Sequence, residues 1–344
     1  MKKWCCACLA LLWVLAVRAE ETVLLPAHEQ PQQQLVIYSA TDYAHMAPLL
    51  RAFQQHRPQV AIRFVDANSQ QLYQRFLEEG AASPADLLLS SAMDLQLKLV
   101  NDGHAQPWRS ERTLALPAGV HWRHELFAIT VEPVVMVFNR ERLGEHALPR
   151  SRQELLTLLR RDPERFRGRL RTYDITQSGV GYLLATQDSL QGESYGRLLE
   201  AFGGLSVRLS ESSNQMLTEL ASGQAVLGYN LLGSYVAAAV ARHPQLVAVA
   251  PRDYSLILMR VALIPRYARH ARLAGELLDF MLSPAGQAAL AEGGLLPLLT
   301  PDAGLTVTPE GPVTPIPLTP ALLPALDPLD KQGFIRTWTG SLAP

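Results

Sequence analysis

Cysteine is almost absent from this sequence, and the little that is present lies at one end. Cys5, Cys6 and Cys8 are the only three cysteines in a chain of 344 residues. The rest of the chain can therefore form neither a disulfide nor a thiolate metal site among its own residues. Its stability has to come from packed apolar side chains, and a chain of this length can bury a sufficient core.

An excess of charge of either sign is also missing. Lys and Arg number 31 and Asp and Glu number 32, so the formal net charge is −1. Proteins that bind nucleic acid usually have a basic face, and this composition gives no reason to expect one. Because 48% of the residues are hydrophobic and 18% are charged, the chain has an ordinary globular composition. Any charged ligand must be recognised at a local site.

The first residues have the pattern of an export signal. Lys2 and Lys3 precede a short apolar run over 9–17, and the small residues up to Ala19 suit signal peptidase. The run is too short for a stable membrane anchor. We expect residues 1–19 to be a cleavable signal peptide and the mature protein to be periplasmic. A lipid-anchored form is disfavoured, because the cysteines precede the apolar run instead of following it.

Short apolar strands alternate with helices along most of the chain, which is typical of α/β folds built from parallel βαβ units. In a first block we expect strands over 35–39, 60–65 and 86–91, and helices over 46–53, 72–79 and 95–100. Extended segments then cover 127–130 and 134–139. In a second block we expect strands over 169–173 and 225–229, and helices over 152–161, 181–186, 195–202, 214–222 and 234–242.

The other segments precede, link or follow these two blocks. Residues 20–34 are polar and are expected to form a leader before regular structure begins. Strands over 246–250 and 256–264 are expected to return to the first block. Beyond 299 the chain is rich in proline, but apolar residues up to Trp338 recur at helical spacing. We expect an ordered strap that ends in a short helix against the first block.

Several segments are similar to the motifs of one protein family, in the family's order: 35–39, 83–90, 134–139, 162–169, 174–182 and 277–297. The last runs from Leu277 to Pro297 and combines an apolar helix, the Ser283-Pro284 turn, a second helix and a glycine stop. Together they resemble the extracytoplasmic solute-binding proteins of ABC importers, in particular the ferric-ion-binding branch with its two-lobed type 2 periplasmic-binding-protein fold.

The resemblance implies an architecture and a division of the chain. Each lobe would be a mixed sheet flanked by helices, and crossing hinge strands would join the lobes around a ligand cleft. Residues 35–130 would form the first part of lobe 1 and 131–255 would form lobe 2. Residues 256–344 would return to lobe 1 and include the proline-rich strap. A monomer is the usual state of the family.

Loops that follow strands and open helices are candidates for the ligand site, and their polar side chains are Ser39, Thr41, Asp42, Ser90, Ser91, Thr176, Gln177 and Ser178. Hydroxyls and backbone N–H groups at helix starts suit a carboxylate or a phosphate. The same side chains could instead cap the helices without contacting a ligand. Family position favours ligand contact in the first and last of these loops and leaves Ser90 and Ser91 open.

A further loop bears on the kind of ligand. Ferric-ion binders have two adjacent tyrosines here, whereas this sequence has Ser234 and Tyr235, with Tyr229 as the substitute for the missing tyrosine. We expect Asn230, Ser234 and Tyr235 to contact the ligand and expect no metal. An iron site that uses Tyr229 and Tyr235 is the alternative.

Two more departures from the family weaken the case for iron. Asp42 stands where the family has a histidine, and Glu132 stands where an arginine is common. A small organic anion, either a carboxylate or a phosphorylated compound, fits the hydroxyl-rich loops better, and Arg260 is the candidate cationic partner. Arg260 could equally be a solvated strand residue. His121 and His124 could pair on a metal but are expected to be surface residues.

The leading hypothesis is a periplasmic binding protein, without enzymatic activity or cofactor, that delivers its solute to an ABC permease in the inner membrane. One alternative is a ligand sensor for a membrane sensor kinase, which needs the same cleft. Another is the binding of ferric ion or a ferric chelate. A secreted hydrolase is less favoured, because the sequence has no nucleophile elbow, zinc-binding helix motif or phosphate loop.

Overall fold

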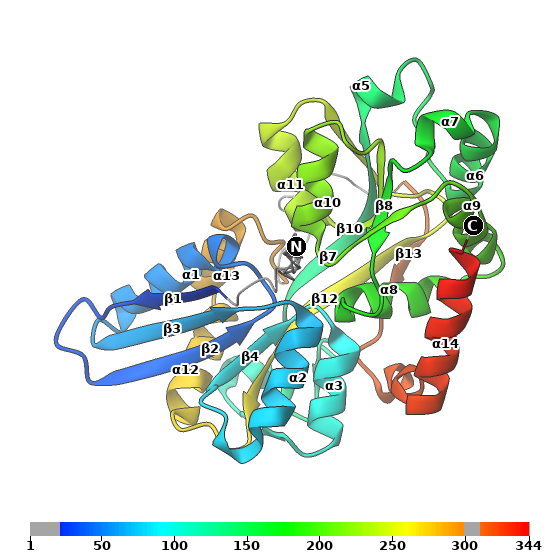
Figure 1. Cartoon of the computed structure of the whole chain (residues 1–344). Coiled ribbons are helices and arrows are strands. Elements are labelled where there is room, and N and C mark those ends of the chain that lie inside the picture. The colour runs from blue at the N-terminus through cyan, green and yellow to red at the C-terminus, as the bar shows by residue number, and fades with distance from the viewer. Residues whose placement is uncertain (1–20, 299–309, 344) are drawn as a thin grey trace, which may run out of the picture.

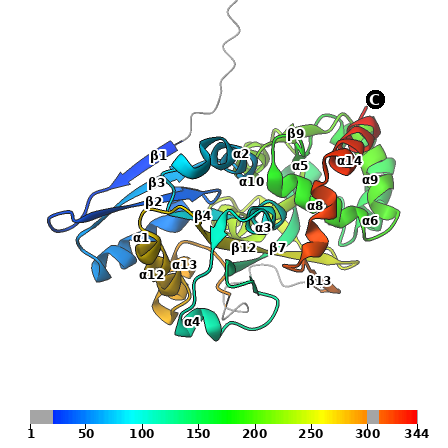
Figure 2. The same cartoon turned by 90° about the horizontal axis from the view of Figure 1, so that it is seen from below.

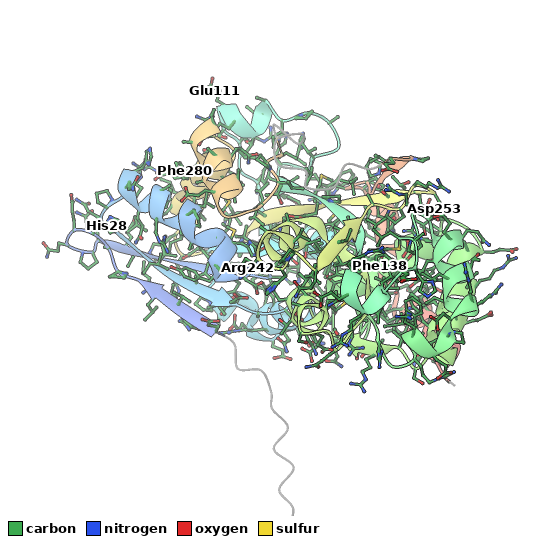
Figure 3. All side chains as sticks on the ribbon, turned by 90° about the horizontal axis from the view of Figure 1, so that it is seen from above. His28, Glu111, Phe138, Arg242, Asp253 and Phe280 are labelled. Carbon is green, nitrogen blue, oxygen red and sulfur yellow. The ribbon has the colours of Figure 1, made fainter. Side chains whose placement is uncertain are left out.

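The computed structural model describes residues 21–298 and 310–343 of the chain. The predicted signal peptide over 1–19 therefore lies outside the described residues. Two groups of strands and helices lie side by side, and we call them lobe 1 and lobe 2 (Figure 1). His28 belongs to lobe 1 and Asp253 to lobe 2, toward opposite ends of the molecule (Figure 3).

Lobe 1 is built on a mixed sheet. β2 (Gln33–Ser39) pairs in parallel with β3 (Val60–Asp66) and β4 (Leu87–Ser90), at the apolar runs that predicted them. β1 (Glu21–Leu25) adds to β3 in antiparallel register. The prediction of a leader without regular structure over 20–34 is therefore wrong. Leu25 at the end of this edge strand is buried in the core, although most residues over 20–34 are polar.

Helices cover both faces of this sheet (Figure 2). One face carries α1 (Tyr43–His56), α12 (Ala271–Met281) and α13 (Pro284–Glu292), and the other carries α2 (Ser69–Glu79) and α3 (Met93–Asn101). Leu35 and Ile37 of β2 join the core of the first group, whereas Val36 and Tyr38 join the core of the second. This division follows from the alternation of side chains along a strand.

The segment from Leu277 to Pro297 forms the predicted helix, turn and second helix. The Ser283 hydroxyl accepts a hydrogen bond from the Gly286 backbone N–H at 3.0 Å and caps α13. Pro284 takes the first helical position, where no N–H is needed. A Cβ atom on Gly286 would lie 1.8 Å from the carbonyl oxygen of Phe280. The geometry of this turn thus accounts for the residues that mark the motif.

Lobe 2 has β8 (Leu170–Tyr173) in parallel with β9 (Arg208–Ser210) and β10 (Leu227–Leu232). Its helices are α5 (Arg140–Leu143), α6 (Arg152–Arg161), α7 (Pro163–Phe166), α8 (Gly179–Ser189), α9 (Ser194–Gly204), α10 (Ser213–Ala221) and α11 (Gly233–Arg242). Smaller elements before β7 are η1 (Gly80–Ala82), β5 (Ala105–Gln106), α4 (Glu111–Leu114) and β6 (His121–Trp122).

Two long antiparallel strands, β7 (Leu126–Asn139) and β12 (Ser255–Pro265), connect the lobes. The first half of β7 pairs with β12, and its second half pairs with β10 and β11 (Leu246–Val249). The other edge of β12 pairs with β4. The expected return of 246–250 to the first block is wrong, because β11 pairs with the lobe 2 half of β7 and so lies in the range 131–255 that the resemblance gave to lobe 2. The predicted boundary at 130/131 falls inside β7.

The C-terminal strap reaches lobe 2. β13 (Val313–Pro315) pairs with β12, and the turns η2 (Pro320–Leu322) and η3 (Pro324–Leu326) lead to α14 (Pro328–Ser341). This helix packs on α9, whereas the sequence predicted a helix against the first lobe. That prediction is wrong, because Trp338 buries itself in the lobe 2 core and donates its indole N–H to the Tyr195 hydroxyl at 3.1 Å.

We predict that Trp338→Ala destabilises the protein by about 3–5 kcal/mol, the usual cost of removing a large buried aromatic side chain. The measurement is urea unfolding followed by circular dichroism. The control is Leu329→Ala in the same helix, because Leu329 is 78% exposed and its loss should change stability by less than about 0.5 kcal/mol. Equal effects of the two substitutions would mean that α14 is not docked on lobe 2.

A buried carboxyl group lies where α3 of lobe 1 meets the strap. Neither carboxylate oxygen of Asp94 has a hydrogen-bond partner among the described residues, and the side chain is fully buried. Burial raises the pKa of Asp94 from its ordinary value of 3.8 to about 7, and the positive charge of Lys331 on α14 opposes the rise. Lys331 itself lies 4.9 Å from the ring centre of Tyr182, and burial lowers its pKa.

Because the pKa of Asp94 is higher in the folded state, the folded protein holds a proton that the unfolded chain releases between about pH 4 and pH 7. Stability should therefore fall as the pH rises through this window. We predict that Asp94→Asn flattens that fall and unfolds at higher urea than the parent at about pH 8. Asp330→Asn, at an exposed position of α14, is the control. A parent and an Asp94→Asn variant with identical pH profiles would contradict the prediction.

Candidate functional site

A cavity of about 180 Å³ lies between the lobes. Lobe 1 lines it with residues that follow β2, β3 and β4, and lobe 2 lines it with residues that follow β8, β9 and β10. The polar lining residues are Glu21, Asp42, Asp66, Asn68, Ser69, Gln71, Ser91, Tyr173, Ser178, Glu211, Ser212, Ser213 and Tyr235. Ligands of α/β sheets bind beyond the carboxyl ends of strands, which is where this cavity lies.

Hydrogen bonds cross the cavity from one lobe to the other. The Asn214 amide of lobe 2 donates to the Asp42 carboxylate of lobe 1. The Asp42 backbone N–H donates to the Tyr235 hydroxyl at 3.3 Å. On the far side, the Asn68 amide donates to the carbonyl oxygen of Gln177 at 3.0 Å, and the Val180 N–H donates to the Ser69 hydroxyl at 3.1 Å. The lobes are therefore held together on both sides of the cavity.

Several predicted site residues make local bonds behind the lining. The Ser39 hydroxyl accepts from the Thr41 N–H at 3.0 Å and donates to the Thr41 carbonyl oxygen at 2.9 Å. The Ser90 hydroxyl accepts from the Ala92 N–H at 3.1 Å. Both serines are fully buried and do not line the cavity. Asp42 and Ser91 from the same two loops do line it.

Of the three predicted residues in the loop over 176–178, only one lines the cavity. Ser178 lines the cavity and caps α8 by accepting the Gly181 N–H at 3.2 Å. Thr176 and Gln177 are exposed, and Thr176 donates its hydroxyl to Asp174 at 2.6 Å. Among this predicted set, Gln177 reaches the other lobe through its backbone carbonyl and not through its side chain.

Arg260 lies behind the cavity, and protein groups accept hydrogen bonds from its guanidinium nitrogens. Its Nε donates to Glu132 Oε1 at 3.0 Å, and both side chains are fully buried. Its other nitrogens donate to Thr41 Oγ1 at 2.8 Å and Ser234 Oγ at 3.2 Å. The second oxygen of Glu132 accepts the Ser234 N–H at 3.1 Å. The network therefore joins both crossing strands, the loop after β2 and the start of α11, and it does not present Arg260 to a solute.

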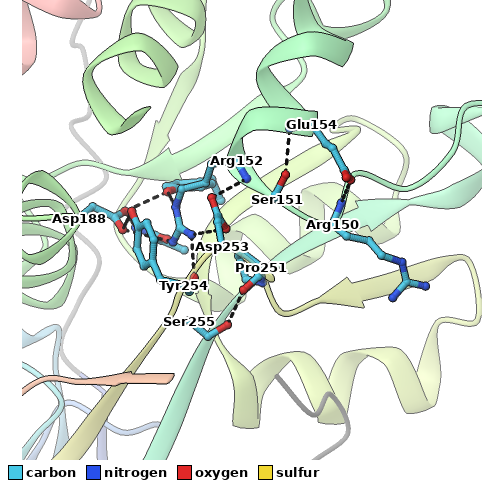
Figure 4. Close-up of polar contacts among 11 residues, drawn as sticks. Arg150, Ser151, Arg152, Glu154, Asp188, Pro251, Asp253, Tyr254 and Ser255 are labelled. Carbon is cyan, nitrogen blue, oxygen red and sulfur yellow. Dashed lines mark hydrogen bonds and ion pairs between the residues drawn. The ribbon is translucent and has the colours of Figure 1, made fainter. Parts of the chain in front are cut away.

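Figure 4 shows Arg152 and Asp188, which lie in a different buried cluster inside lobe 2. Tyr229 and Asn230 belong to this cluster. The Tyr229 hydroxyl accepts from Arg152 at 2.7 Å and donates to Asp188 at 3.0 Å. The Asn230 amide donates to Asp188 at 2.7 Å. Burial raises the pKa of Tyr229 well above its ordinary value. Neither residue lines the cavity, so Tyr229 and Tyr235 do not meet there as a pair of ligands.

The histidines at 121 and 124 stack on each other with ring centres 5.2 Å apart. Burial is the main reason that the pKa of His121 is lowered. Among the described residues, no group of three or more His, Cys, Asp or Glu side chains is arranged to hold a metal ion.

Sequence reasoning missed an important part of the lining, namely Asp66, Asn68 and the segment 211–213. Asp66 ends β3 and Asn68 caps α2, and the segment 211–213 links β9 to the first residue of α10. These residues have the same strand-then-helix position as the loops that were chosen. The residues that end or follow the strands of the two blocks, taken together, include these lining residues.

The comparisons with known proteins agree with this geometry. Residues 35–296 match the family model of bacterial extracellular solute-binding proteins. The chain belongs to this family. Its members bind substrates and are not enzymes, and the family implies a location outside the cytoplasm, a small-molecule ligand and an ABC permease as partner. No curated protein matches the chain significantly. No helix among the described residues has the length and apolar character needed to cross a membrane.

Solved structures extend the comparison. The substrate-binding protein of an ABC transporter from Agrobacterium tumefaciens is 32% identical, with 94% of this chain and 98% of that chain covered and a TM-score of 0.89. The fructose-6-phosphate-bound periplasmic binding protein AfuA from Actinobacillus pleuropneumoniae is 18% identical (90% and 99% covered, TM-score 0.73). Iron-bound HitA from Pseudomonas aeruginosa is 19% identical (90% and 99% covered, TM-score 0.70). The last two show the shared two-lobed fold.

We predict that Arg260→Met costs about 3–5 kcal/mol of stability, because it leaves Glu132 charged and buried without its partner. The double variant Arg260→Met/Glu132→Leu should lose less than the sum of the two single changes, since no charge is then stranded. Urea unfolding of the four proteins measures this coupling. Additive losses would show that the two side chains do not stabilise each other.

Proposed function

We propose that this protein captures a small polar solute in the cavity between the lobes, closes over it, and presents the closed form to the permease of an ABC importer. The observation that carries the proposal is the set of hydrogen bonds that cross the cavity, because they exist only when the lobes are together. Asn214 reaches Asp42, and Asn68 reaches Gln177, on opposite sides of the lining.

Closure of this kind is a population shift. A solute held by both lobes binds the closed form better than the open form, so it stabilises closure by that difference in affinity. The lining suits such a role, because Asp42, Asp66 and Ser91 come from lobe 1 while Tyr173 and Glu211 come from lobe 2. A solute that contacts both sets is released only when the lobes separate.

The cavity gives little support to an organic anion as the solute. That hypothesis needs a cationic side chain, and Arg260 is 1% exposed with its nitrogens committed to Glu132, Thr41 and Ser234. Three of the helix starts at the cavity, those of α2, α8 and α10, are already capped by the side chains of Asn68, Ser178 and Ser212. An anion would therefore meet carboxylates without a compensating positive charge.

A ferric ion is supported no better. Ferric iron requires ionised phenolates or other hard oxygen donors, and the tyrosines that line the cavity are Tyr173 and Tyr235. Burial raises the pKa of both hydroxyls well above the ordinary value. The Tyr173 hydroxyl also shares a 2.7 Å hydrogen bond with Ser213. Ionising either group without a bound cation would be costly, and among the described residues no group of three or more His, Cys, Asp or Glu side chains is arranged to hold a metal ion.

We predict that the double variant Asn68→Ala/Asn214→Ala has a larger radius of gyration than the parent in small-angle X-ray scattering, because both sides of the closed form lose a hydrogen bond. A thermal-shift screen of carboxylates, sugar phosphates, amines and ferric citrate should identify a compound that stabilises the parent in proportion to its excess over Kd. The same compound should stabilise the double variant less, since closure contributes to its binding.

Asn101→Ala is the matched control. Asn101 is exposed at the end of α3, away from the lining, and should alter neither the scattering nor the thermal shift. If the double variant scattered like the parent, closure would not depend on these bonds. If no compound class stabilised the parent, solute capture itself would be contradicted.

A further inference from the structure

The described residues that line the cavity between the lobes include acidic side chains and no basic ones. Asp42 and Asp66 face it from lobe 1, Glu211 faces it from lobe 2, and Glu21 completes the set. No Lys, Arg or His occurs among the described residues that line the cavity. The local charge therefore differs sharply from that of the whole chain, whose net formal charge is −1. A cavity with this lining attracts cations and repels anions.

The nearest buried cation does not offset this charge. Arg260 lies behind the lining and is paired with the equally buried Glu132 at 3.0 Å, so the pair contributes no net charge. The polar partners of Asp42 across the cavity are the neutral amide of Asn214 and the neutral hydroxyl of Tyr235. These two neutral partners therefore leave the negative charge of Asp42 unbalanced.

Helix starts around the cavity reduce the negative potential without reversing it. α1, α2, α3, α8, α10 and α11 begin at the lining, and first-turn N–H groups of α2, α8 and α10 are accepted by Asn68, Ser178 and Ser212. A helix start is equivalent to roughly half a positive charge, whereas each ionised carboxylate carries a full negative one. The acidic lining therefore exceeds the positive ends of the helices.

Closure brings these like charges together. Asp42 and Asp66 move with lobe 1 and Glu211 moves with lobe 2, so a closed empty cavity gathers carboxylates from both sides. In the absence of a cation, their repulsion makes the closed form less stable, although the hydrogen bonds of Asn68 and Asn214 favour it. A cation held between them removes that repulsion and gains more from the closed form than from the open one. The charge of the solute would therefore control the motion of the lobes.

The arrangement favours an organic cation over a metal ion. The carboxylates of the lining are not clustered tightly enough with other donors to form a metal site among the described residues. The ring of Tyr173 also lines the cavity and offers contact to the carbon atoms and to the charge of an ammonium compound, whereas the centre of the Tyr235 ring already lies 5.2 Å from the Arg260 guanidinium. Carboxylates accept strong hydrogen bonds from charged N–H groups.

We propose, on the basis of the proposed function, that the solute is a small organic cation with ammonium N–H groups, held between Asp42 and Asp66 of lobe 1 and Glu211 of lobe 2. The cavity of about 180 Å³ limits it to a small molecule. Neutralisation of the lining by this cation drives the lobes together. The ligand is thus opposite in charge to the anion expected from the hydroxyl-rich loops.

The test uses probes that share a four-carbon chain and differ at their ends: 1,4-diaminobutane, 4-aminobutanol, 1,4-butanediol and succinate. Calorimetry and thermal shift should detect binding of the two ammonium compounds, and the diol and succinate should bind at least ten-fold more weakly, about the fold-change expected when a charged hydrogen bond is lost. Binding should weaken at high salt. Glu211→Gln should weaken the diamine by a similar factor, and Asp66→Asn is the second variant.

Glu200→Gln is the matched control, since Glu200 is exposed on α9 and does not line the cavity. Failure of both ammonium compounds to bind overturns the inference, and so does diamine binding that Glu211→Gln and Asp66→Asn leave unchanged. Tighter binding of succinate than of the diamine would contradict the inferred positive charge of the ligand but would still support solute capture. If neither these probes nor the wider screen gives binding, the proposed function falls as well.

Discussion

The buried ion pair between Arg260 and Glu132 is the interaction on which the rest of the structure depends. Glu132 lies on β7 and Arg260 on β12, the two strands that join the lobes. Each charge is stable in the interior only because the other is present and because Thr41 and Ser234 supply further hydrogen bonds. The pair therefore ties the loop after β2 and the start of α11 to the hinge. Since both charges are committed to this task, neither can recognise a solute.

The cavity in front of this pair obtains its character from other residues. Asp66 follows β3, Glu211 follows β9, and Asp42 follows β2, so carboxylates from separate loops meet only where the two lobes face each other. The hydrogen bonds of Asn68 and Asn214 close the same space. The ion pair on the two connecting strands and the polar contacts at the cavity thus involve separate residues.

Much of the fold could be predicted from the sequence, because apolar strands and helices are local patterns. The errors have a common cause. The sequence does not predict β1, because its short apolar run over 23–25 is followed by a polar segment and only Leu25 is buried. β11 and α14 pack against the lobe opposite to the predicted one. Partner choice depends on surfaces far away in sequence, such as the α9 face that receives Trp338. Side-chain direction is likewise set by the folded surroundings. Ser39 and Ser90 belong to loops that reach the cavity, but their hydroxyls bond to nearby backbone groups instead of facing it.

The sequence by itself determined the α/β class, the two-block organisation and the family, since hydrophobic periodicity and the 277–297 turn are local properties of the chain. It also placed Asp42, Ser91, Ser178 and Tyr235 in loops that reach the cavity. Only the tertiary structure decided that Arg260 is neutralised by Glu132 and that acidic side chains from both lobes converge. The physical reason is that the charge of a site is a sum over residues brought together by folding, and no local pattern records that sum.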